Sequence, residues 1–144
     1  SMKLPDKKIG FTLTELLVVV IIVGILATLA LPMLVKTLEK AKVGEAASNL
    51  NLIRTGQKIY YLEYNSFSSS IDSLNIENPN DQSNRYFNYT ASSAGDDLSV
   101  NFTATATRGG GDAIDAPSEY QGVVYYIDKS GEMTSSDGMF KPQN

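Results

Sequence analysis

The feature that most constrains this chain is an apolar run from Phe11 to Val35, which follows a short basic stretch. Its only charged residue is Glu15, and from Leu16 to Val35 the only polar side chain is Thr28. About twenty residues of α-helix rise roughly 30 Å, which is the thickness of the hydrocarbon core of a membrane. The run therefore predicts a membrane-spanning helix over residues 11–35.

The charge of Glu15 is unusual in such a run. A carboxylate inside lipid costs about 2.5–3.5 kcal/mol on insertion scales, so the sequence predicts a partner for it. A secretory signal peptide fits less well, because signal-peptide cores are usually about 7–15 residues long. An ordinary single-span anchor explains the length of the run but not the acid.

Two further properties of the run leave alternatives open. Positive flanks usually orient a span, but three lysines stand on each side: Lys3, Lys7 and Lys8 before it, and Lys36, Lys40 and Lys42 after it. Gly24 and Pro32 both weaken a helix, because glycine is flexible and proline lacks a backbone donor. They predict either an ordinary kink or a segment that loses helical order and stretches.

Composition excludes several classes of function. The 144 residues include 16 acidic and 12 basic ones, with no long Lys/Arg tract, so no direct binding of nucleic acid is predicted. The chain has no Cys and therefore neither disulfides nor thiolate metal sites. It also has no His, which removes the commonest general base. No clustered acid pair replaces it, so we expect no enzymatic activity.

The second half of the chain predicts a helix followed by a sheet. Residues 36–64 continue as an amphipathic helix, and the face expected to be buried holds Leu38, Ala41, Glu45, Ala46, Leu50, Ile53, Gln57, Tyr60 and Tyr64. Residues 65–84 read as a loop with a short helical turn near Ile71–Leu74. The expected class is therefore α+β: a long helix, its first half transmembrane, packed on an antiparallel sheet.

Four runs predict the strands of that sheet. They are Tyr86–Ala91, Leu98–Thr107, Gly122–Asp128 and Glu132–Thr134. Residues 99–107 alternate between polar and apolar side chains, which favours a half-exposed antiparallel strand. Ser92–Asp97 is expected to form the first turn, and the residues from Asp128 to Gly131 predict a hairpin turn.

The N-terminal forty residues carry a specific motif. Lys7-Lys8-Ile9-Gly10 precedes Phe11-Thr12-Leu13-Thr14-Glu15-Leu16-Leu17, and Gly24-Ile25-Leu26-Ala27 and Pro32 follow. In these residues the chain resembles the type IV filament family, which comprises type IV pilins and the pseudopilins of type II secretion. A weaker likeness extends through the helix to Phe67 and into residues 102–108 and 123–134. The resemblance implies the pilin fold.

The resemblance also implies how the chain is processed. A prepilin peptidase would remove residues 1–10 as a leader by cutting between Gly10 and Phe11, and Phe11 would be N-methylated. The leader would be cytoplasmic, and the rest (residues 36–64 and 65–144) would lie outside the bacterial inner membrane. The subunit would leave the lipid through an assembly platform and join related subunits in a helical filament. Glu15 would pair with the new amine of Phe11, within its own helix or in a neighbouring subunit.

Two functions remain open within this family. The Gly56-Gln57 and Tyr60-Tyr61 pairs and the strand Phe102–Ala106 favour a pilus subunit, which would serve adhesion or twitching motility. The alternative is a pseudopilin of a secretion or competence (DNA-uptake) system. An anchored enzyme would need a catalytic constellation, and the sequence offers none.

Acidic residues and a glycine-rich run are weaker indications of binding sites. Asp112, Asp115, Asp128 and Asp137 are candidate calcium ligands, as in some pseudopilins, but their spacing is not that of an EF-hand. We expect no cofactor otherwise. The run from Arg108 to Gly111 lacks the ending of a phosphate-binding loop, so it predicts a flexible loop.

Overall fold

The computed structural model describes residues 10–93, 95, 97–136 and 138. One helix, α1 (Leu13–Tyr64), precedes two short 3₁₀ helices, η1 (Ile71–Ser73) and η2 (Pro79–Asp81). Four strands follow: β1 (Phe87–Ser92), β2 (Thr103–Arg108), β3 (Val124–Asp128) and β4 (Met133–Ser135). The contacts divide the chain into an N-terminal unit that ends at Thr37 and a C-terminal unit that begins at Leu38, and each is described by itself.

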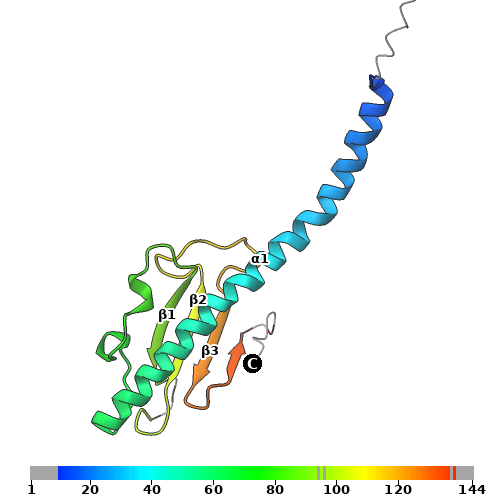
Figure 1. Cartoon of the computed structure of the whole chain (residues 1–144). Helices are drawn as coiled ribbons and strands as arrows, with labels where there is room; N and C mark the ends of the chain where they lie inside the picture. Colours follow the sequence, from blue (N-terminus) through cyan, green and yellow to red (C-terminus); the bar gives the residue numbers. More distant parts are fainter. Residues whose placement is uncertain (1–9, 94, 96, 137, 139–144) are drawn as a thin grey trace, which may run out of the picture. The chain divides into compact units, whose positions relative to one another are not determined.

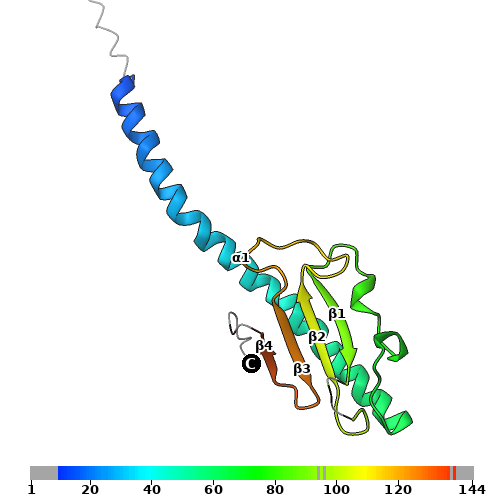
Figure 2. The same ribbon diagram turned by 180° about the vertical axis from the view of Figure 1, so that it is seen from behind.

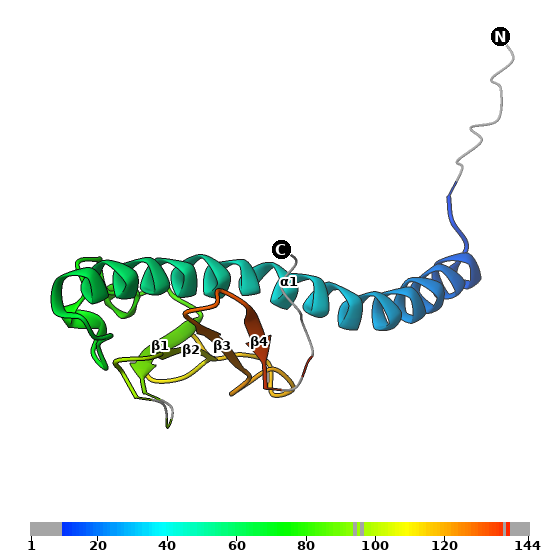
Figure 3. The ribbon, with the colours of Figure 1, turned by 90° about the horizontal axis from the view of Figure 1, so that it is seen from below.

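The four strands form one antiparallel sheet in the order β1-β2-β3-β4. In the C-terminal unit α1 lies across one face of this sheet (Figures 1 and 3). The structure thus confirms the expected α+β class, with a long helix on four antiparallel strands. It also confirms the helical turn near residue 71 and the hairpin turn after Asp128, where Gly131 N donates to Asp128 O at 3.1 Å.

The core lies between α1 and the sheet. Leu50 and Ile53 of the helix are fully buried against the inward-facing residues of the strands, which are Phe87, Tyr89, Ala104, Ala106, Tyr125 and Ile127. The alternation expected in β2 is present, since its alanines point inward and its threonines stay partly exposed. Alanine on the inner face of β2 leaves room for the helix to approach the middle of the sheet.

Two predictions about this core were wrong in detail. Leu38 and Ala41 are exposed, while Glu39 and Val43 are buried in their place. Tyr64, at the helix end, is also exposed (62%). The buried stripe runs through Glu39, Val43, Ala46, Leu50, Ile53 and Gln57, at the spacing of three and four residues that one helix face requires. An acid occupies the position where an apolar residue was expected.

The second strand is shorter than predicted. It begins at Thr103 rather than Leu98, because Asp97 holds the preceding residues in a turn. Asp97 O accepts hydrogen bonds from Val100 N and Asn101 N at 2.8 and 2.9 Å, and its carboxylate accepts one from Ser99 N. A local side-chain bond of this kind competes with the ladder of a sheet.

The outer edge of β1 is occupied by a side chain. Asn80 of η2 donates to Tyr89 O and accepts from Tyr89 N, both at 2.8 Å. Glu45 of α1 accepts from Tyr86 N at 3.0 Å, just before the strand. These bonds satisfy backbone groups that an edge strand would otherwise present to solvent.

Candidate functional site

The start of α1 carries a capping box. Thr12 N donates to Glu15 Oε2 and Glu15 N donates to Thr12 Oγ1, each at 3.2 Å. This reciprocal pair satisfies two of the backbone donors that the first turn of a helix leaves without partners. The negative charge also lies near the positive end of the helix dipole, which favours it. The sequence Thr-Leu-Thr-Glu therefore fixes the first turn at Leu13.

The peptide bond between Gly10 and Phe11 precedes this first turn. Gly10, Phe11 and Thr12 are outside the helix, and the Phe11 side chain is 77% exposed. A shallow groove at this end is lined by Phe11, Thr14, Glu15, Val18 and Val19. Phe11 and Glu15 thus line one local surface, as their spacing of four residues predicts.

The side chains of the N-terminal unit form a long apolar surface. Every residue from Gly10 to Leu34 is exposed. Within the described residues, α1 contains a segment that is long and apolar enough to cross a membrane, with a mean hydropathy of 2.9, and none of it is buried. An exposed apolar surface of this extent is far larger than those of ordinary soluble proteins and requires cover from lipid or other chains.

Gly24 and Pro32 do not interrupt the helix in this structure, so neither acts here as a helix breaker. Pro32 supplies no N–H to the carbonyl of Thr28, and the Thr28 hydroxyl donates to Gly24 O at 2.8 Å. A methyl group added at Gly24 would meet no atom within 4 Å. The alternative in which this segment loses helical order in a filament stays a prediction.

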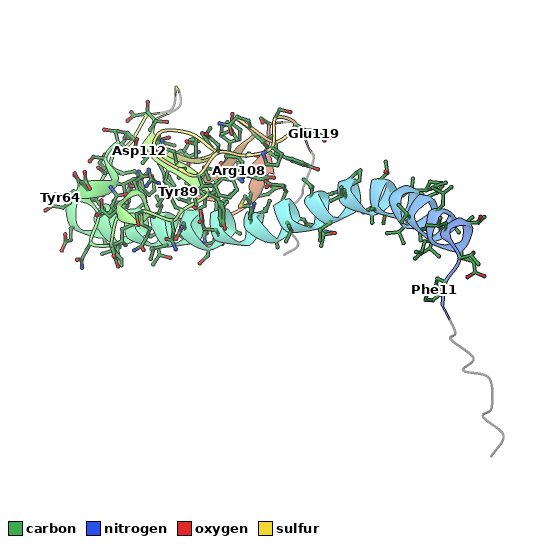
Figure 4. The ribbon with its side chains drawn as sticks, turned by 90° about the horizontal axis from the view of Figure 1, so that it is seen from above. Phe11, Tyr64, Tyr89, Arg108, Asp112 and Glu119 are labelled. Carbon is green, nitrogen blue, oxygen red and sulfur yellow. The ribbon has the colours of Figure 1, made fainter. Side chains whose placement is uncertain are left out.

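A buried ion pair joins α1 to the sheet in the C-terminal unit. Glu39 and Arg108 are 3% and 2% exposed. Arg108 Nε donates to Glu39 Oε2 at 3.0 Å, and Nη2 donates to Oε1 at 3.2 Å. Arg108 Nη1 also donates to the carbonyls of Tyr86 and Ile114, so the guanidinium links the helix to the residue before β1 and to the loop after β2. Arg108 is labelled in Figure 4, within the C-terminal unit.

A second cation and an aromatic ring complete this cluster. Lys42 Nζ lies 3.0 Å from Glu39 Oε1 and 4.7 Å from the centre of the Tyr86 ring, and Arg108 lies 5.2 Å from that centre. Burial alone would raise the pKa of Glu39, but the hydrogen bonds and charges of Arg108 and Lys42 lower it below its usual value. Glu39 is therefore ionised at neutral pH.

Tyr89 is held by polar side chains of α1. Its hydroxyl donates to Glu45 Oε2 at 2.6 Å and accepts from Asn49 Nδ2 at 3.0 Å. Burial, with the neighbouring Glu45 carboxylate, raises the pKa of Tyr89 well above its usual range, so the phenol stays neutral. Gln57, which is fully buried, bonds both backbone groups of Ser68. These polar contacts fix the register between the helix and the rest of the C-terminal unit.

The candidate calcium ligands are not brought together. Asp112 and Asp115 are exposed in the loop between β2 and β3, and Asp128 ends β3, where it binds Ser130. Asp137 lies outside the described residues. Across the described part of the chain, no three acidic side chains form a group that could hold a metal ion. The geometry therefore gives no support to calcium, which stays an untested prediction.

The glycines after Arg108 form a hydrogen-bonded turn rather than the flexible loop expected. Gly109 N donates to Tyr86 O at 3.0 Å and Gly110 N to Thr107 O at 3.2 Å, so these donors are not free to bind phosphate. Gln121 Nε2 donates to Gly109 O at 3.0 Å, and this side-chain bond also stabilises the turn. Gly109 has a φ of 70°, in the left-handed region.

Gly109→Ala should destabilise the C-terminal unit by about 1–3 kcal/mol, the usual cost of a side chain held in a strained backbone region. An added Cβ would also lie 2.2 Å from Gln121 Oε1 and displace it. Gly44→Ala is the matched control: its added methyl meets nothing, and alanine favours a helix by up to about 1 kcal/mol. Urea unfolding of the full chain in micelles, followed by near-UV circular dichroism, measures both. Equal stability of the two variants would contradict this role of Gly109.

Comparison with known proteins agrees with both parts of this arrangement. The prokaryotic N-terminal methylation motif matches residues 6–31, which include the helix start and Glu15. The type IV pilin-like G and H family matches residues 44–139, which include most of α1 after Thr37 and all four strands. The chain belongs to the type IV pilin-like G and H family. Its resemblance to pilins and pseudopilins is thereby confirmed.

Individual relatives of this pilin-like chain are of both kinds. The type IV major pilin protein PilA of Myxococcus xanthus is 37% identical over 87 residues, which cover 60% of this chain and 39% of that protein. Type II secretion system core protein G of Escherichia coli is 36% identical over 81 residues, covering 54% of this chain and 55% of that protein. A fimbrial protein of Neisseria meningitidis is 38% identical over 81 residues, covering 54% and 45%. The chain spans about half the length of these relatives.

The sequence predicts the helix start but not the ion pair. Gly10, Phe11 and Glu15 were identified as candidate site residues, whereas Glu39 and Arg108 were not. One signal was present in the pilin-like sequence: Glu39 stands at the helical spacing of the buried residues Val43, Ala46 and Leu50. Arg108 continues the inward positions of β2, after Ala104 and Ala106. Two opposite charges at core positions on separate elements predict a buried pair.

Proposed function

We propose that this chain is the precursor of a structural subunit of a type IV pilus and has no enzymatic activity. The observation that carries the proposal is the fully exposed apolar surface of residues 10–34, headed by the capped carboxylate of Glu15. Lipid covers such a surface in the inner membrane, and the equivalent helices of other subunits cover it in a filament. The same apolar surface would thus contact lipid in the membrane-bound precursor and other subunits in the filament.

In this proposal, cleavage between Gly10 and Phe11 by a prepilin peptidase creates a cationic partner for Glu15. The new α-amino group, which has an ordinary pKa of about 7.7–8.0, remains cationic when N-methylated. It lies four residues before Glu15, on the same side of the helix start. Within the described residues Glu15 Oε2 accepts the capping bond, and no bond to Oε1 is observed. A carboxylate with one oxygen free can accept the amine of its own or a neighbouring subunit.

The proposed sites and partners follow from this sequence of events. The precursor has a cytoplasmic leader and a C-terminal unit outside the inner membrane, and an assembly platform delivers the processed subunit into an extracellular filament. The match to the N-terminal methylation motif supports processing and N-methylation at Phe11. The PilA and fimbrial relatives support a pilus.

A pseudopilin is the second candidate, because core protein G of type II secretion is also a relative. In that case a short periplasmic filament would drive secretion or DNA uptake. Electron microscopy and secretion assays of a deletion strain separate the two. Long surface filaments that contain this chain favour the pilus, and lost secretion or uptake without surface filaments favours the pseudopilin.

Mass spectrometry of the protein purified from its native host tests the processing step. The mature chain should begin at Phe11 and carry one added methyl group on its amine. A strain of the same host whose own prepilin peptidase is catalytically inactive is the control and should leave the leader attached. Filaments built from subunits that retain the leader would overturn the proposed function.

A further inference from the structure

The sheet has a second face, which points away from α1. Figure 2 shows this face, and no described element lies across it. Its side chains are the alternate residues of each strand, and they are only partly buried. Threonine is the commonest residue among them, and its side chain is uncharged and carries a hydroxyl group.

The strand register places four of these side chains in one row. Thr90 pairs with Thr105, Thr105 pairs with Tyr126, and Tyr126 pairs with Thr134. The Thr90 and Thr105 hydroxyls are hydrogen-bonded to each other. The row therefore crosses all four strands and presents one aromatic ring among three hydroxyl groups.

A polar groove of about 150 Å³ opens on this face beside the Tyr126 ring. Its lining residues come from β2, β3, β4 and the hairpin turn, and they are Thr103, Tyr126, Ile127, Asp128, Ser130, Glu132 and Thr134. The groove thus combines one aromatic ring, two carboxylates and three hydroxyls. All of these residues belong to the C-terminal unit.

We propose that this groove binds a pyranose unit of a neutral polysaccharide. One face of a pyranose ring consists of C–H groups, which pack on the apolar body of a tyrosine ring. Its rim carries neighbouring hydroxyls, which donate charge-assisted hydrogen bonds to carboxylates and exchange bonds with threonine and serine hydroxyls. A small number of polar groups placed around an aromatic surface is the general design of such sites.

The charge of the groove narrows the class of saccharide. Asp128 and Glu132 are acidic, and among the described residues no cationic side chain lines the groove. The hydrogen bonds from Ser130 to Asp128 lower the pKa of that carboxyl, so it is ionised at neutral pH. Two negative charges repel the carboxylates or sulfates of an acidic polysaccharide but complement the donor hydroxyls of a neutral one. This proposal concerns the single subunit and is independent of filament assembly.

Calorimetric titration of the full chain with cellohexaose and with N-acetylated chitohexaose tests the site. The chain is kept in a zwitterionic, sugar-free detergent, because glycoside detergents would compete for the groove. We expect at least one neutral hexasaccharide to bind, and Tyr126→Ala to weaken that binding by about tenfold or more. Tyr64→Ala is the matched control, since Tyr64 is exposed on α1, outside the groove, and should leave binding unchanged.

A second variant tests the groove in case Tyr126→Ala does not fold. Glu132 is exposed, so Glu132→Gln keeps the fold, as circular dichroism checks, and should weaken binding by about threefold to tenfold. An acidic oligogalacturonide should not bind, and the chelator EGTA should leave binding unchanged. The proposal is overturned if neither neutral hexasaccharide binds, if the groove variants bind like the wild type, or if binding requires calcium or a charged saccharide.

Discussion

Glu15→Gln should abolish filament assembly and leave cleavage after Gly10 intact. Glutamine preserves the capping box, because its side chain still accepts the bond from Thr12 N, so the helix start keeps its geometry. The charge alone is lost. An amine left without its carboxylate in a low-dielectric bundle costs about 3–5 kcal/mol, which reduces a subunit's affinity for the filament by two to four orders of magnitude. Immunoblots of the sheared filament and membrane fractions measure assembly and processing separately.

Thr12→Ala is the matched control for this experiment. It removes the capping bond and costs about 0.5–2 kcal/mol at the helix start, but it keeps the charge of Glu15. Filaments should therefore still form. Glu15→Val removes both cap and charge and should behave like Glu15→Gln, with normal processing and no filaments. Wild-type filament yield from either Glu15 variant would refute the proposed charge pair.

Glu39→Ala should destabilise the C-terminal unit by about 3–5 kcal/mol, because it strands the buried guanidinium of Arg108. A loss of this size is a large fraction of the stability of a small domain. Lys42→Ala is the control: Lys42 is partly exposed, and its bond to Glu39 should contribute no more than about 1 kcal/mol. Urea unfolding of the full chain in micelles measures all variants, and equal effects of the two would disprove the role of the pair.

The double variant Glu39→Leu with Arg108→Met separates charge from packing. It removes both charges, so it should recover most of what Glu39→Ala loses. Recovery should be incomplete, because Arg108 also donates to the carbonyls of Tyr86 and Ile114. The loss of a hydrogen bond from a charged donor costs about 1.5–3 kcal/mol.

The same pair predicts the response to acid. The pKa of Glu39 is lower in the folded chain than its ordinary value, so the contribution of the pair is complete above the unfolded pKa, about 4.3. It is lost as the pH falls through the lower, folded pKa. The wild type should therefore lose stability below about pH 4 more steeply than Glu39→Ala does.

Local patterns predicted most of the fold. The apolar run and the alternation of residues 103–107 depend on neighbours in the sequence, and both α1 and β2 follow them. The start of β2 was missed because Asp97 stabilises a turn through residues whose alternation is also that of a strand. Tyr64 was assigned to the core by spacing alone, but α1 ends there and the side chain remains exposed.

In the candidate site, too, the sequence predicts the local contacts but not the long-range ones. The helix start is a local motif, since Thr12 and Glu15 bond each other across one turn. The pair of Glu39 with Arg108 joins residues 69 positions apart, so neither residue's own neighbourhood reveals the other. Because Leu38 is more apolar than Glu39, it was the residue expected on the buried face of α1. Glu39 fits there only because Arg108 of β2 supplies the opposite charge.

The Asn80 amide, bonded to both backbone groups of Tyr89, has a consequence for the proposed filament, in which subunits would lie at high local density. It takes the place that a strand from another copy would need in order to extend the sheet beyond β1. Crowded subunits are thus prevented from joining edge to edge at β1 into cross-β aggregates. Growth of the proposed filament can then rely on the reversible burial of apolar helices, which would leave the sheets of neighbouring subunits separate along this edge.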